Sequence, residues 1–552
     1  MKYTGLGVGL GAVVGPVRRM STTVVPEPVD TVSPLSVEEE TARARSALEL
    51  VAADLRARAR RAGGDAADVL AAQALMAGDP DVWEDIESQL AQRKTAEWAV
   101  TQAFQSFVAM LQSLGGTQAE RASDLVDVSR RTVAALMGVS AGEVPDSDQP
   151  FVLVAEDLSP ADTAVLDLSR VLALVTSGGS PTAHTAILAR AKGLVAVVSA
   201  PGVQDIPEGE LVVVDAAEGS IETSPSQERI AEVRARMDEV DDEGAMEPGR
   251  MADGTAVPLL ANVGSVENVQ NAVAKGAEGV GLLRTEFMFM DATEAPSVAE
   301  QTARYRDIFE ALDGRKAVAR TLDAGADKPL AFLPLGHEEN PALGVRGIRT
   351  VHDHEQLMRD QLTALAAAAS AVPSGLWVMA PMVSDAAEAA MFATMAREAG
   401  IAKVGVMVEV PSCAVLADQV YQVVDFASIG TNDLTQYTLA ADRQNGAVAS
   451  YQDAWHPSVL RLIGMVGEAA TTSGKPLSVC GEAASDPLLA VVLVGLGVTS
   501  LSMVPNALRE VRATLLRYSV DEARMLAEVA LAATSAGDAR AAVRAALPRP
   551  PR

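Results

Sequence analysis

The chain has 552 residues, of which 49% are hydrophobic, and it carries a formal net charge of −28 at pH 7. This length favours about three or four domains of roughly 150 residues each. The acidic balance disfavours nucleic acid and anionic membrane surfaces as partners, and it favours either a basic protein partner or, for most of these charges, a role in solubility alone. A small anionic substrate would have to be gathered by a local cluster of arginines.

Membrane insertion and disulfide bonds are not expected from this sequence. No run reaches the roughly 18 uninterrupted apolar residues of a membrane helix. The apolar start, Gly5–Gly15, contains five glycines, which is typical of a strand or hairpin rather than of a signal peptide. The two cysteines, Cys413 and Cys480, are too few for a disulfide framework or a zinc site. We therefore predict a cytoplasmic protein without direct membrane insertion.

Residues 30–143 are predicted to form a bundle of about four helices, because apolar residues such as Trp83 and Ile86 recur at helical spacing. Ser36 and Glu39 have the spacing of a capping box at the start of the first helix. Breaks between the helices are expected at Gly63-Gly64, Gly78-Asp79-Pro80 and Gly115-Gly116.

An α/β domain is predicted from residues 1–29 together with residues 144–225, so that the helical bundle is either inserted into this domain or adjoins it. Short apolar runs alternate there with turns. The predicted strands are Phe151–Ala155, Val171–Thr176, Val195–Ser199 and Leu211–Asp215, with others between residues 3 and 25. Residues 226–248 are charged with sparse apolar positions, and we predict a linker helix there.

The segment from Ser177 to Arg190 carries the first chemical signal. It contains a glycine pair and then His184, and it lies between two strand-like runs. A glycine-rich turn that leads into a helix can present backbone N–H groups to an anion. Together with the arginine-rich second half of the chain, this segment indicates a phosphohistidine enzyme.

Residues 249–552 are predicted to form a (β/α)8 barrel, because strand-like runs alternate with helical patterns throughout. Nine runs are candidate strands, one more than the barrel needs, and which of them lies outside it is left open. They are Val257–Val263, Val280–Arg284, Ala317–Leu322, a short run near Val345–Ile348, Trp377–Pro381, Val404–Val410, Phe426–Gly430, Leu477–Cys480 and Leu501–Val504.

Polar residues cluster just past the ends of these strands, where the carboxyl ends of parallel strands share one face of a barrel. Several arginines suit a substrate with both phosphate and carboxylate groups. Glu409 and Asp433 could share a cation such as Mg²⁺ with substrate oxygens and water. The residues of this predicted site are Arg284, Arg320, Asp323, Arg346, Arg349, Glu409, Asn432, Asp433, Arg443, Cys480 and Glu482.

The two cysteines differ in their expected surroundings. Cys413 lies at the expected start of a helix and is interpreted as structural. Cys480 lies at a strand end beside Gly481 and Glu482, where a reactive thiol could reach a substrate. Taken alone, a buried core position is still favoured for Cys480.

These motifs resemble enzyme I of the bacterial phosphotransferase system, the phosphoenolpyruvate–protein phosphotransferase family. The resemblance covers nearly the whole chain, including the helical block around Ala96–Val100. The most specific stretches are Gly281–Asp291 (GLLRTEFMFMD), Val408–Pro411 (VEVP), Ser428–Arg443 (SIGTNDLTQYTLAADR) and Cys480–Glu482 (CGE).

The resemblance implies roles for individual residues. His184 matches the histidine that phosphoenolpyruvate phosphorylates. Cys480 matches the residue that protonates the enolpyruvate carbon, which reverses the interpretation of that thiol drawn from its surroundings alone. Glu409 and Asp433 match the magnesium ligands. The positions that match substrate-binding residues are Arg284, Arg320, Asn432, Asp433 and Arg443, and Arg346 belongs to the same cluster.

The resemblance also implies partners and a moving domain. The helical bundle would bind a small histidine-containing phosphocarrier protein, and the barrel would bind phosphoenolpyruvate and form a homodimer. The α/β domain would swing on the linker of residues 226–248 and carry His184 from phosphoenolpyruvate to the carrier, in the first step of sugar uptake.

Three places depart from the family pattern. Ser180-Pro181 adds a residue before the histidine, Val345 stands where an aromatic residue is expected, and residues 197–202 lack the usual Val-Gly-Thr run.

Two alternative functions are kept. A relative of phosphoenolpyruvate synthase and pyruvate phosphate dikinase would need a nucleotide-binding domain ahead of the histidine domain. A catalytically inactive regulatory paralogue would show an eroded site.

Overall fold

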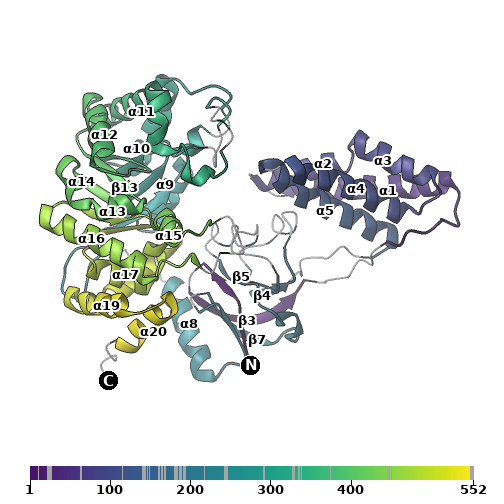
Figure 1. The fold of residues 1–552 in the computed structure, drawn as a ribbon. Helices are drawn as coiled ribbons and strands as arrows, with labels where there is room; N and C mark the ends of the chain where they lie inside the picture. Colours follow the sequence, from purple (N-terminus) through teal and green to yellow (C-terminus); the bar gives the residue numbers. More distant parts are fainter. Residues whose placement is uncertain are drawn as a thin grey trace. The chain divides into compact units, whose positions relative to one another are not determined.

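A computed structural model describes the chain in two compact units, Met1–Glu239 and Val240–Arg552 (Figure 1). The residues outside the description are 10, 21–27, 62–64, 115, 140–144, 146, 148, 159–161, 163–165, 167–169, 179–184, 186–188, 190–193, 217, 242–246, 290–291, 326–329, 334–335, 337, 373–374, 444–447, 449–450 and 548–552.

The described part of the helical block contains five helices, one more than expected. They are α1 (Val37–Arg61), α2 (Asp65–Met76), α3 (Pro80–Ala91), α4 (Ala96–Leu114) and α5 (Gly116–Met137). Leu55, Ile86 and Phe104 are buried in their shared core. Asp79 caps α3 at the predicted break, whereas Gly63, Gly64 and Gly115 lie outside the described residues.

The predicted capping box at the start of α1 is confirmed. The backbone N–H of Glu39 donates to Oγ of Ser36 at 3.2 Å, and the backbone N–H of Ser36 donates to Oε2 of Glu39 at 2.8 Å. These bonds satisfy two backbone donors that the first turn of a helix leaves free.

The α/β domain is built on an eight-stranded sheet with the order β1-β8-β7-β3-β4-β5-β6-β2. β3 pairs in parallel with β4, with Val17 opposite Val152, so the helical bundle is an insertion between two neighbouring strands. The strands are β1 (Lys2–Thr4), β2 (Leu6–Val8), β3 (Ala12–Arg19), β4 (Phe151–Ala155), β5 (Val171–Thr176), β6 (Val195–Val198), β7 (Leu211–Asp215) and β8 (Ser220–Thr223).

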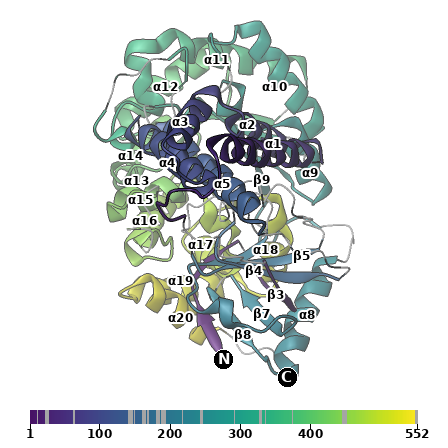
Figure 2. The same cartoon turned by 90° about the vertical axis from the view of Figure 1, so that its right-hand side faces the viewer.

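The predicted linker helix appears as α8 (Gln227–Asp241), and its first half packs on this sheet (Figures 1 and 2). Ile230 and Val233 are buried in a cluster with Val14 and Val213. The apolar positions of this charged segment therefore serve to attach it to the sheet.

The second unit contains a closed barrel of eight parallel strands in the order β10-β11-β12-β13-β14-β15-β16-β9, which confirms the predicted barrel. The strands are β9 (Leu259–Val263), β10 (Gly279–Arg284), β11 (Lys316–Arg320), β12 (Gly375–Ala380), β13 (Val404–Val408), β14 (Phe426–Ile429), β15 (Leu477–Val479) and β16 (Ser500–Met503). Of the nine candidates, the run near Val345–Ile348 is the one outside the barrel, because it forms a short 3-10 helix at Gly347–Thr350.

Helices surround the barrel (Figures 1 and 2). They are α9 (Val266–Ala274), α10 (Val298–Leu312), α11 (Val351–Ala371), α12 (Ala386–Glu398), α13 (Pro411–Val415), α14 (Ala417–Val423), α15 (Thr431–Leu439), α16 (Pro457–Ser473), α17 (Pro487–Gly495), α18 (Leu508–Leu515), α19 (Val520–Ala532) and α20 (Ala536–Ala546). Among the residues described, no helix combines the length and the apolar character needed to cross a membrane.

Candidate active site at the barrel mouth

The carboxyl ends of the barrel strands form one end of the barrel, called here the barrel mouth, and the predicted polar residues lie there. Arg284 ends β10, Arg320 ends β11, Glu409 follows β13, Asp433 lies in the first turn of α15, and Cys480 follows β15. The closed order of the strands brings residues far apart in sequence into one site.

Arg320 is buried and held by two carboxylates. Its Nη2 donates to Oε1 of Glu286 at 2.9 Å, and its Nη1 lies 3.2 Å from Oδ2 of Asp323. Although burial opposes its charge, Glu286 and Asp323 hold the pKa of Arg320 above its ordinary value. Although Arg284 is exposed at the end of β10, desolvation by the surrounding protein and the positive charge of Arg320 lower its pKa. The two guanidinium groups are therefore within electrostatic reach of each other, as a site for a multiply charged anion requires.

Arg346 is the most buried of the five arginines predicted at the site and is 1% exposed. Its Nε and Nη2 donate to Asp323 at 2.9 and 3.0 Å, and its Nη1 and Nη2 donate to Asp433 at 3.2 and 3.3 Å. Nη1 also donates to the hydroxyl of Tyr437 at 3.3 Å. The guanidinium thus bridges two carboxylates, and its contact with a substrate stays a prediction.

Glu409 is completely buried. Its Oε1 accepts from the backbone N–H of Met382 at 2.6 Å, whereas Oε2 has no hydrogen-bond partner among the described residues. A Cβ at Gly430 would lie only 3.0 Å from that oxygen, so the glycine leaves it uncovered. Burial and the negative charge of Asp433 raise the pKa of Glu409 well above its ordinary value. A buried, unpartnered carboxylate oxygen beside a second carboxylate suits a divalent cation.

The cation would need ligands beyond these two side chains. In the described part of the chain, no group of three or more His, Cys, Asp or Glu side chains is arranged to hold a metal ion. Two protein carboxylates completed by substrate oxygens and water are typical of Mg²⁺ sites in phosphoryl transfer. The residues present therefore fit magnesium better than a metal that needs a complete set of protein ligands.

Asn432 and Arg443 flank Asp433 at the barrel mouth. Oδ1 of Asn432 accepts from the backbone N–H of Glu482 at 2.9 Å, which joins the segments after β14 and β15. Nη1 of Arg443 lies 3.7 Å from Oδ2 of Asp433, and 35% of the arginine side chain is exposed. Arg443 thus presents positive charge to solvent at the edge of the site.

Cys480 lies in the apolar interior of the barrel, in a cluster that includes Leu282 and Met407, and it is 3% exposed. Its backbone N–H and its thiol both approach the carbonyl oxygen of Ile429, at 3.0 and 3.5 Å. Burial raises the pKa of the thiol to about 11, so the thiol keeps its proton at neutral pH. Burial and a proton-donor role are therefore compatible, since a donor must hold a proton.

Cys413 is also buried, on the short helix α13. Burial raises its pKa to about 12. The interpretation of Cys413 as a structural residue agrees with this placement.

His184 and the preceding pair Ser180-Pro181 lie outside the described residues, so the role of His184 stays a prediction. The next residue is described. Thr185 is buried, and its hydroxyl donates to Oδ1 of Asp157 at 3.0 Å. This bond ties the residue after the histidine to the segment that follows β4.

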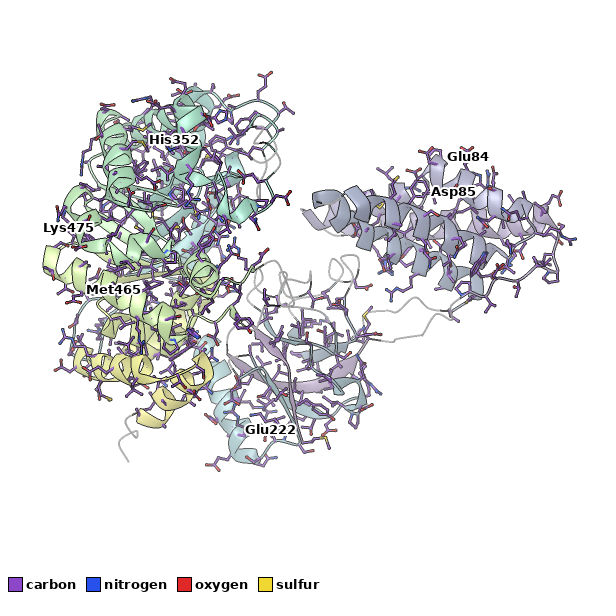
Figure 3. The ribbon with its side chains drawn as sticks, viewed as in Figure 1. Glu84, Asp85, Glu222, His352, Met465 and Lys475 are labelled. Carbon is purple, nitrogen blue, oxygen red and sulfur yellow. The ribbon has the colours of Figure 1, made fainter. Side chains whose placement is uncertain are left out.

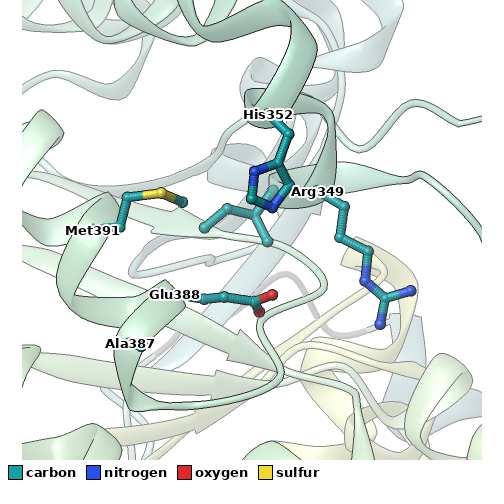
Figure 4. A pocket seen from close by; sticks show the side chains of 6 residues that line it. Arg349, His352, Ala387, Glu388 and Met391 are labelled. Carbon is teal, nitrogen blue, oxygen red and sulfur yellow. The ribbon is translucent and has the colours of Figure 1, made fainter.

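Arg349 is predicted to lie in the arginine cluster, but in the structure its side chain donates hydrogen bonds to backbone carbonyls. Its Nη1 donates to the carbonyl oxygens of Leu343 and Gly344 at 3.1 and 3.0 Å. It borders a separate cavity of about 220 Å³, in which His352 and Glu388 face each other while the Arg349 side chain points away from His352 (Figure 4). The cavity is lined by Ile348, Arg349, His352, Ala387, Glu388 and Met391.

Sequence reasoning missed several residues that organise the site. Glu286 lies inside a recognised motif but received no role. Gln361 on α11 accepts from the backbone N–H of Leu322 at 2.9 Å and donates to the hydroxyl of Thr285 at 3.0 Å, and no local pattern indicates such a contact. Asn262 is the last residue but one of β9, a polar residue near the carboxyl end of an apolar strand, and the rule that placed Arg284 at the site could have found it.

The matches to family models agree with this architecture. The model described as "PEP-utilising enzyme, N-terminal" matches residues 4–121, the "mobile domain" model matches residues 147–219, and the "PEP-binding domain" model matches residues 239–520. The barrel with its ring of arginines and carboxylates, preceded by the strand-and-bundle unit, is that of a phosphoenolpyruvate-utilising enzyme.

Similar proteins narrow the class. A Streptomyces coelicolor protein named phosphoenolpyruvate-protein phosphotransferase is 52% identical over 98% of both chains. A protein of the same name from Geobacillus stearothermophilus is 36% identical over 96% of this chain and 95% of its own. The chain belongs to the phosphoenolpyruvate-protein phosphotransferase family. An NMR solution structure of an enzyme I protein (nEIt) is 28% identical, with a TM-score of 0.39, over 44% of this chain and all of its own.

Proposed function

We propose that this protein transfers the phosphoryl group of phosphoenolpyruvate to His184, releases pyruvate, and passes the phosphoryl group to the histidine of a small phosphocarrier protein. This is the first step of sugar uptake by a phosphotransferase system. The observation that carries the proposal is the barrel mouth, where buried arginines surround a carboxylate pair with an unpartnered oxygen. Full-length relatives named for this activity support it.

Phosphoenolpyruvate carries a phosphate and a carboxylate, and both anions suit guanidinium groups. We assign its binding to Arg284, Arg320, Arg346, Asn432, Asp433 and Arg443. The positive charge of Arg320, which lowers the pKa of Arg284, supports this assignment, because an anion bound near both guanidinium groups offsets their repulsion. The exposed guanidinium of Arg443 gives the incoming substrate a first contact.

We assign Mg²⁺ to Glu409 and Asp433, and the unpartnered Oε2 of Glu409 supports this assignment. When bound, the metal would neutralise substrate charge and polarise the leaving group. No further protein side chain is needed to bind the metal, since substrate oxygens and water would complete its ligand set.

The chemistry that follows uses one nitrogen and one thiol. The lone pair of the neutral His184 imidazole attacks phosphorus in line, the bond from phosphorus to the enol oxygen breaks, and enolpyruvate leaves with the electron pair. The thiol of Cys480 then gives its proton to the methylene carbon, which yields pyruvate and a thiolate. Water returns a proton to the thiolate. The raised pKa of Cys480 supports this role, because the thiol is protonated before the step.

The remaining parts of the proposal concern partners and place. We assign carrier binding to the helical bundle of residues 30–143, homodimer formation to the barrel of residues 249–552, and swinging of the His184 domain to residues 226–248. We also place the protein in the cytoplasm. The resemblance of the sequence supports these assignments, and the net charge of −28 favours a basic carrier.

The proposed function is favoured over both alternatives. Against a relative of phosphoenolpyruvate synthase or pyruvate phosphate dikinase, relatives that are 52% and 36% identical over nearly the whole chain are named phosphoenolpyruvate-protein phosphotransferase. An inactive paralogue would have lost site residues, but the arginines, Glu409, Asp433 and Cys480 are all present.

The test is transfer of ³²P from labelled phosphoenolpyruvate in the presence of Mg²⁺. We expect acid-labile, base-stable label on the wild type and on His352→Ala, a histidine of the separate cavity, and none on His184→Ala. Added phosphocarrier should remove the label. Label that cannot be transferred to a carrier would favour the synthase-like alternative. Absence of label on a folded wild-type protein would favour the inactive paralogue.

A further inference from the structure

We infer that Asn262 is a positioning residue that orients Cys480 for proton transfer, and that Ser502 holds Asn262 in place. The inference rests on the proposed function, in which Cys480 protonates the enolpyruvate carbon. It concerns a hydrogen-bonded chain of three residues on three neighbouring segments of the barrel.

Asn262 spans the gap between two strands that do not pair directly. It lies on β9, Cys480 follows β15, and β16 runs between them. Nδ2 of Asn262 donates to the carbonyl oxygen of Cys480 at 2.9 Å. Oγ of Ser502 on β16 donates to Oδ1 of Asn262 at 2.6 Å. The carbonyl of Cys480 can only accept, so the amide nitrogen must face it, and the hydroxyl of Ser502 holds the amide oxygen on the other side.

The space for Ser502 depends on a glycine of the most specific sequence motif. Ser502 is completely buried. A Cβ at Gly281 on β10 would lie 2.5 Å from Oγ of Ser502, a distance that real contacts do not allow. The first glycine of the GLLRTEF stretch is therefore required by packing. Any side chain there would displace Ser502 and remove its hydrogen bond to Asn262.

Hydrogen bonds hold the backbone of Cys480 on both sides of its Cα atom. Its N–H donates to the carbonyl of Ile429 on β14 at 3.0 Å, and its C=O accepts from Asn262. Because the direction of a side chain follows from the placement of its own backbone, these two bonds together set where the thiol points. The bond from Ile429 belongs to the strand ladder, whereas the bond from Asn262 comes from a side chain and can be removed by substitution.

Proton transfer to carbon is sensitive to such placement. The donor must lie within hydrogen-bond reach of the receiving atom in the correct orientation, and a displacement of about 1 Å can cost about 100-fold in rate. Phosphoryl transfer to His184 does not use the thiol. A loss of Asn262 should therefore slow the proton step and leave the phosphoryl step little changed.

The experiment uses the full chain with Mg²⁺ and measures the two steps separately. Exchange of the methyl hydrogens of pyruvate with D₂O, followed by ¹H NMR, reports the proton step without phosphoenolpyruvate. Rapid-quench labelling with ³²P-phosphoenolpyruvate reports the phosphoryl step. The variants are Asn262→Ala, Ser502→Ala and Cys480→Ala, with Asn268→Ala on α9 as the control.

We expect Asn262→Ala to slow methyl exchange by about 100-fold, as a displaced donor would, while rapid labelling stays close to that of the wild type. The solvent deuterium isotope effect on pyruvate formation should rise, because the proton step then limits the rate. Ser502→Ala should reduce exchange less, since the amide remains present. Ser502→Ala also keeps the inference testable if Asn262→Ala does not fold. Asn268→Ala should behave as the wild type.

Other outcomes would overturn specific statements. If Cys480→Ala abolishes exchange but Asn262→Ala and Ser502→Ala do not reduce it, the positioning role is wrong and the role of Cys480 stands. If Asn262→Ala slows exchange and labelling equally, Asn262 acts on the whole site and the inference is again wrong. If Cys480→Ala retains exchange, the proposed role of Cys480 fails and the inference fails with it.

Discussion

Asp433 accepts hydrogen bonds on both of its carboxylate oxygens from a buried arginine. Arg346 makes these bonds at 3.2 and 3.3 Å, and it holds Asp323 through Nε and Nη2 at the same time. Side chains that orient a metal ligand typically change metal affinity 10–100-fold when removed. We therefore expect Arg346 to act on the metal site by holding Asp433 in one orientation.

Arg346→Lys tests this expectation because lysine keeps the charge but cannot make forked hydrogen bonds to two carboxylates. Binding of Mn²⁺ in the absence of phosphoenolpyruvate should weaken by about 10-fold or more, as measured by electron paramagnetic resonance of free Mn²⁺. Arg349→Lys, whose arginine donates to backbone carbonyls, should bind Mn²⁺ as the wild type does. Equal Mn²⁺ affinity in the two variants would contradict the role of Arg346.

At the scale of helices and strands, the sequence pattern predicted those elements that depend on residues close together in the chain. The eight barrel strands are apolar runs bounded by polar residues, and Ser36 with Glu39 forms the cap that its spacing indicates. Val345–Ile348 has the composition of a strand but is not one. Gly347 takes a φ of +59°, and Arg346 is drawn to Asp323 and Asp433. Such contacts join residues distant in the sequence, so a local pattern cannot reveal them.

For the active site, too, local sequence patterns predicted some features and contacts between distant residues determined others. The rule that strand ends of a parallel barrel share one face predicted the placement of Arg284, Glu409 and Cys480. It could not show that Arg346 would bridge two carboxylates, or that Gln361 would support the segment after β11, because those contacts depend on side-chain geometry. The role of a strand-end residue was thus harder to predict than its place.

Ser36→Ala should loosen the first turn of α1. Removing a serine cap shifts the local opening equilibrium by roughly fivefold, so backbone amides of residues 37–40 should exchange hydrogen about that much faster, as measured by mass spectrometry. Ser106→Ala on the exposed face of α4 should leave this exchange unchanged.

The effect of Ser36→Ala should also depend on pH. The backbone N–H and the hydroxyl of Ser36 lower the pKa of Glu39 in the folded protein. Stability from this pair is therefore present above the ordinary pKa of glutamate and is lost as the pH falls through the lowered value. A difference between wild type and Ser36→Ala that persisted in full below that value would contradict the capping-box explanation.

At the scale of the whole molecule, charge is distributed in two ways. The net charge is −28, and much of it is exposed, as Glu84 and Asp85 on α3 illustrate (Figure 3). Arg320 and Arg346 at the barrel mouth are instead paired with buried or largely buried carboxylates. Exposed charge acts over about 10 Å at 0.1 M salt, so it can steer a protein partner, whereas the buried pairs act only on a ligand inside the site.

Association with the proposed phosphocarrier should therefore slow as salt is added. Steered association can exceed unsteered association by 10-fold or more, and screening at about 0.5 M NaCl should remove most of that gain. We expect the association rate constant, measured by stopped flow, to fall accordingly while the dissociation rate constant changes less. A double variant with Glu84→Gln and Asp85→Asn should lower the association rate constant at low salt. A control double variant with Asp313→Asn and Asp521→Asn, two highly exposed positions of the barrel unit, should lower it less. If both double variants lower the rate equally, association depends only on the total charge of the protein. If the rate constant does not change with salt, the acidic surface does not steer the carrier.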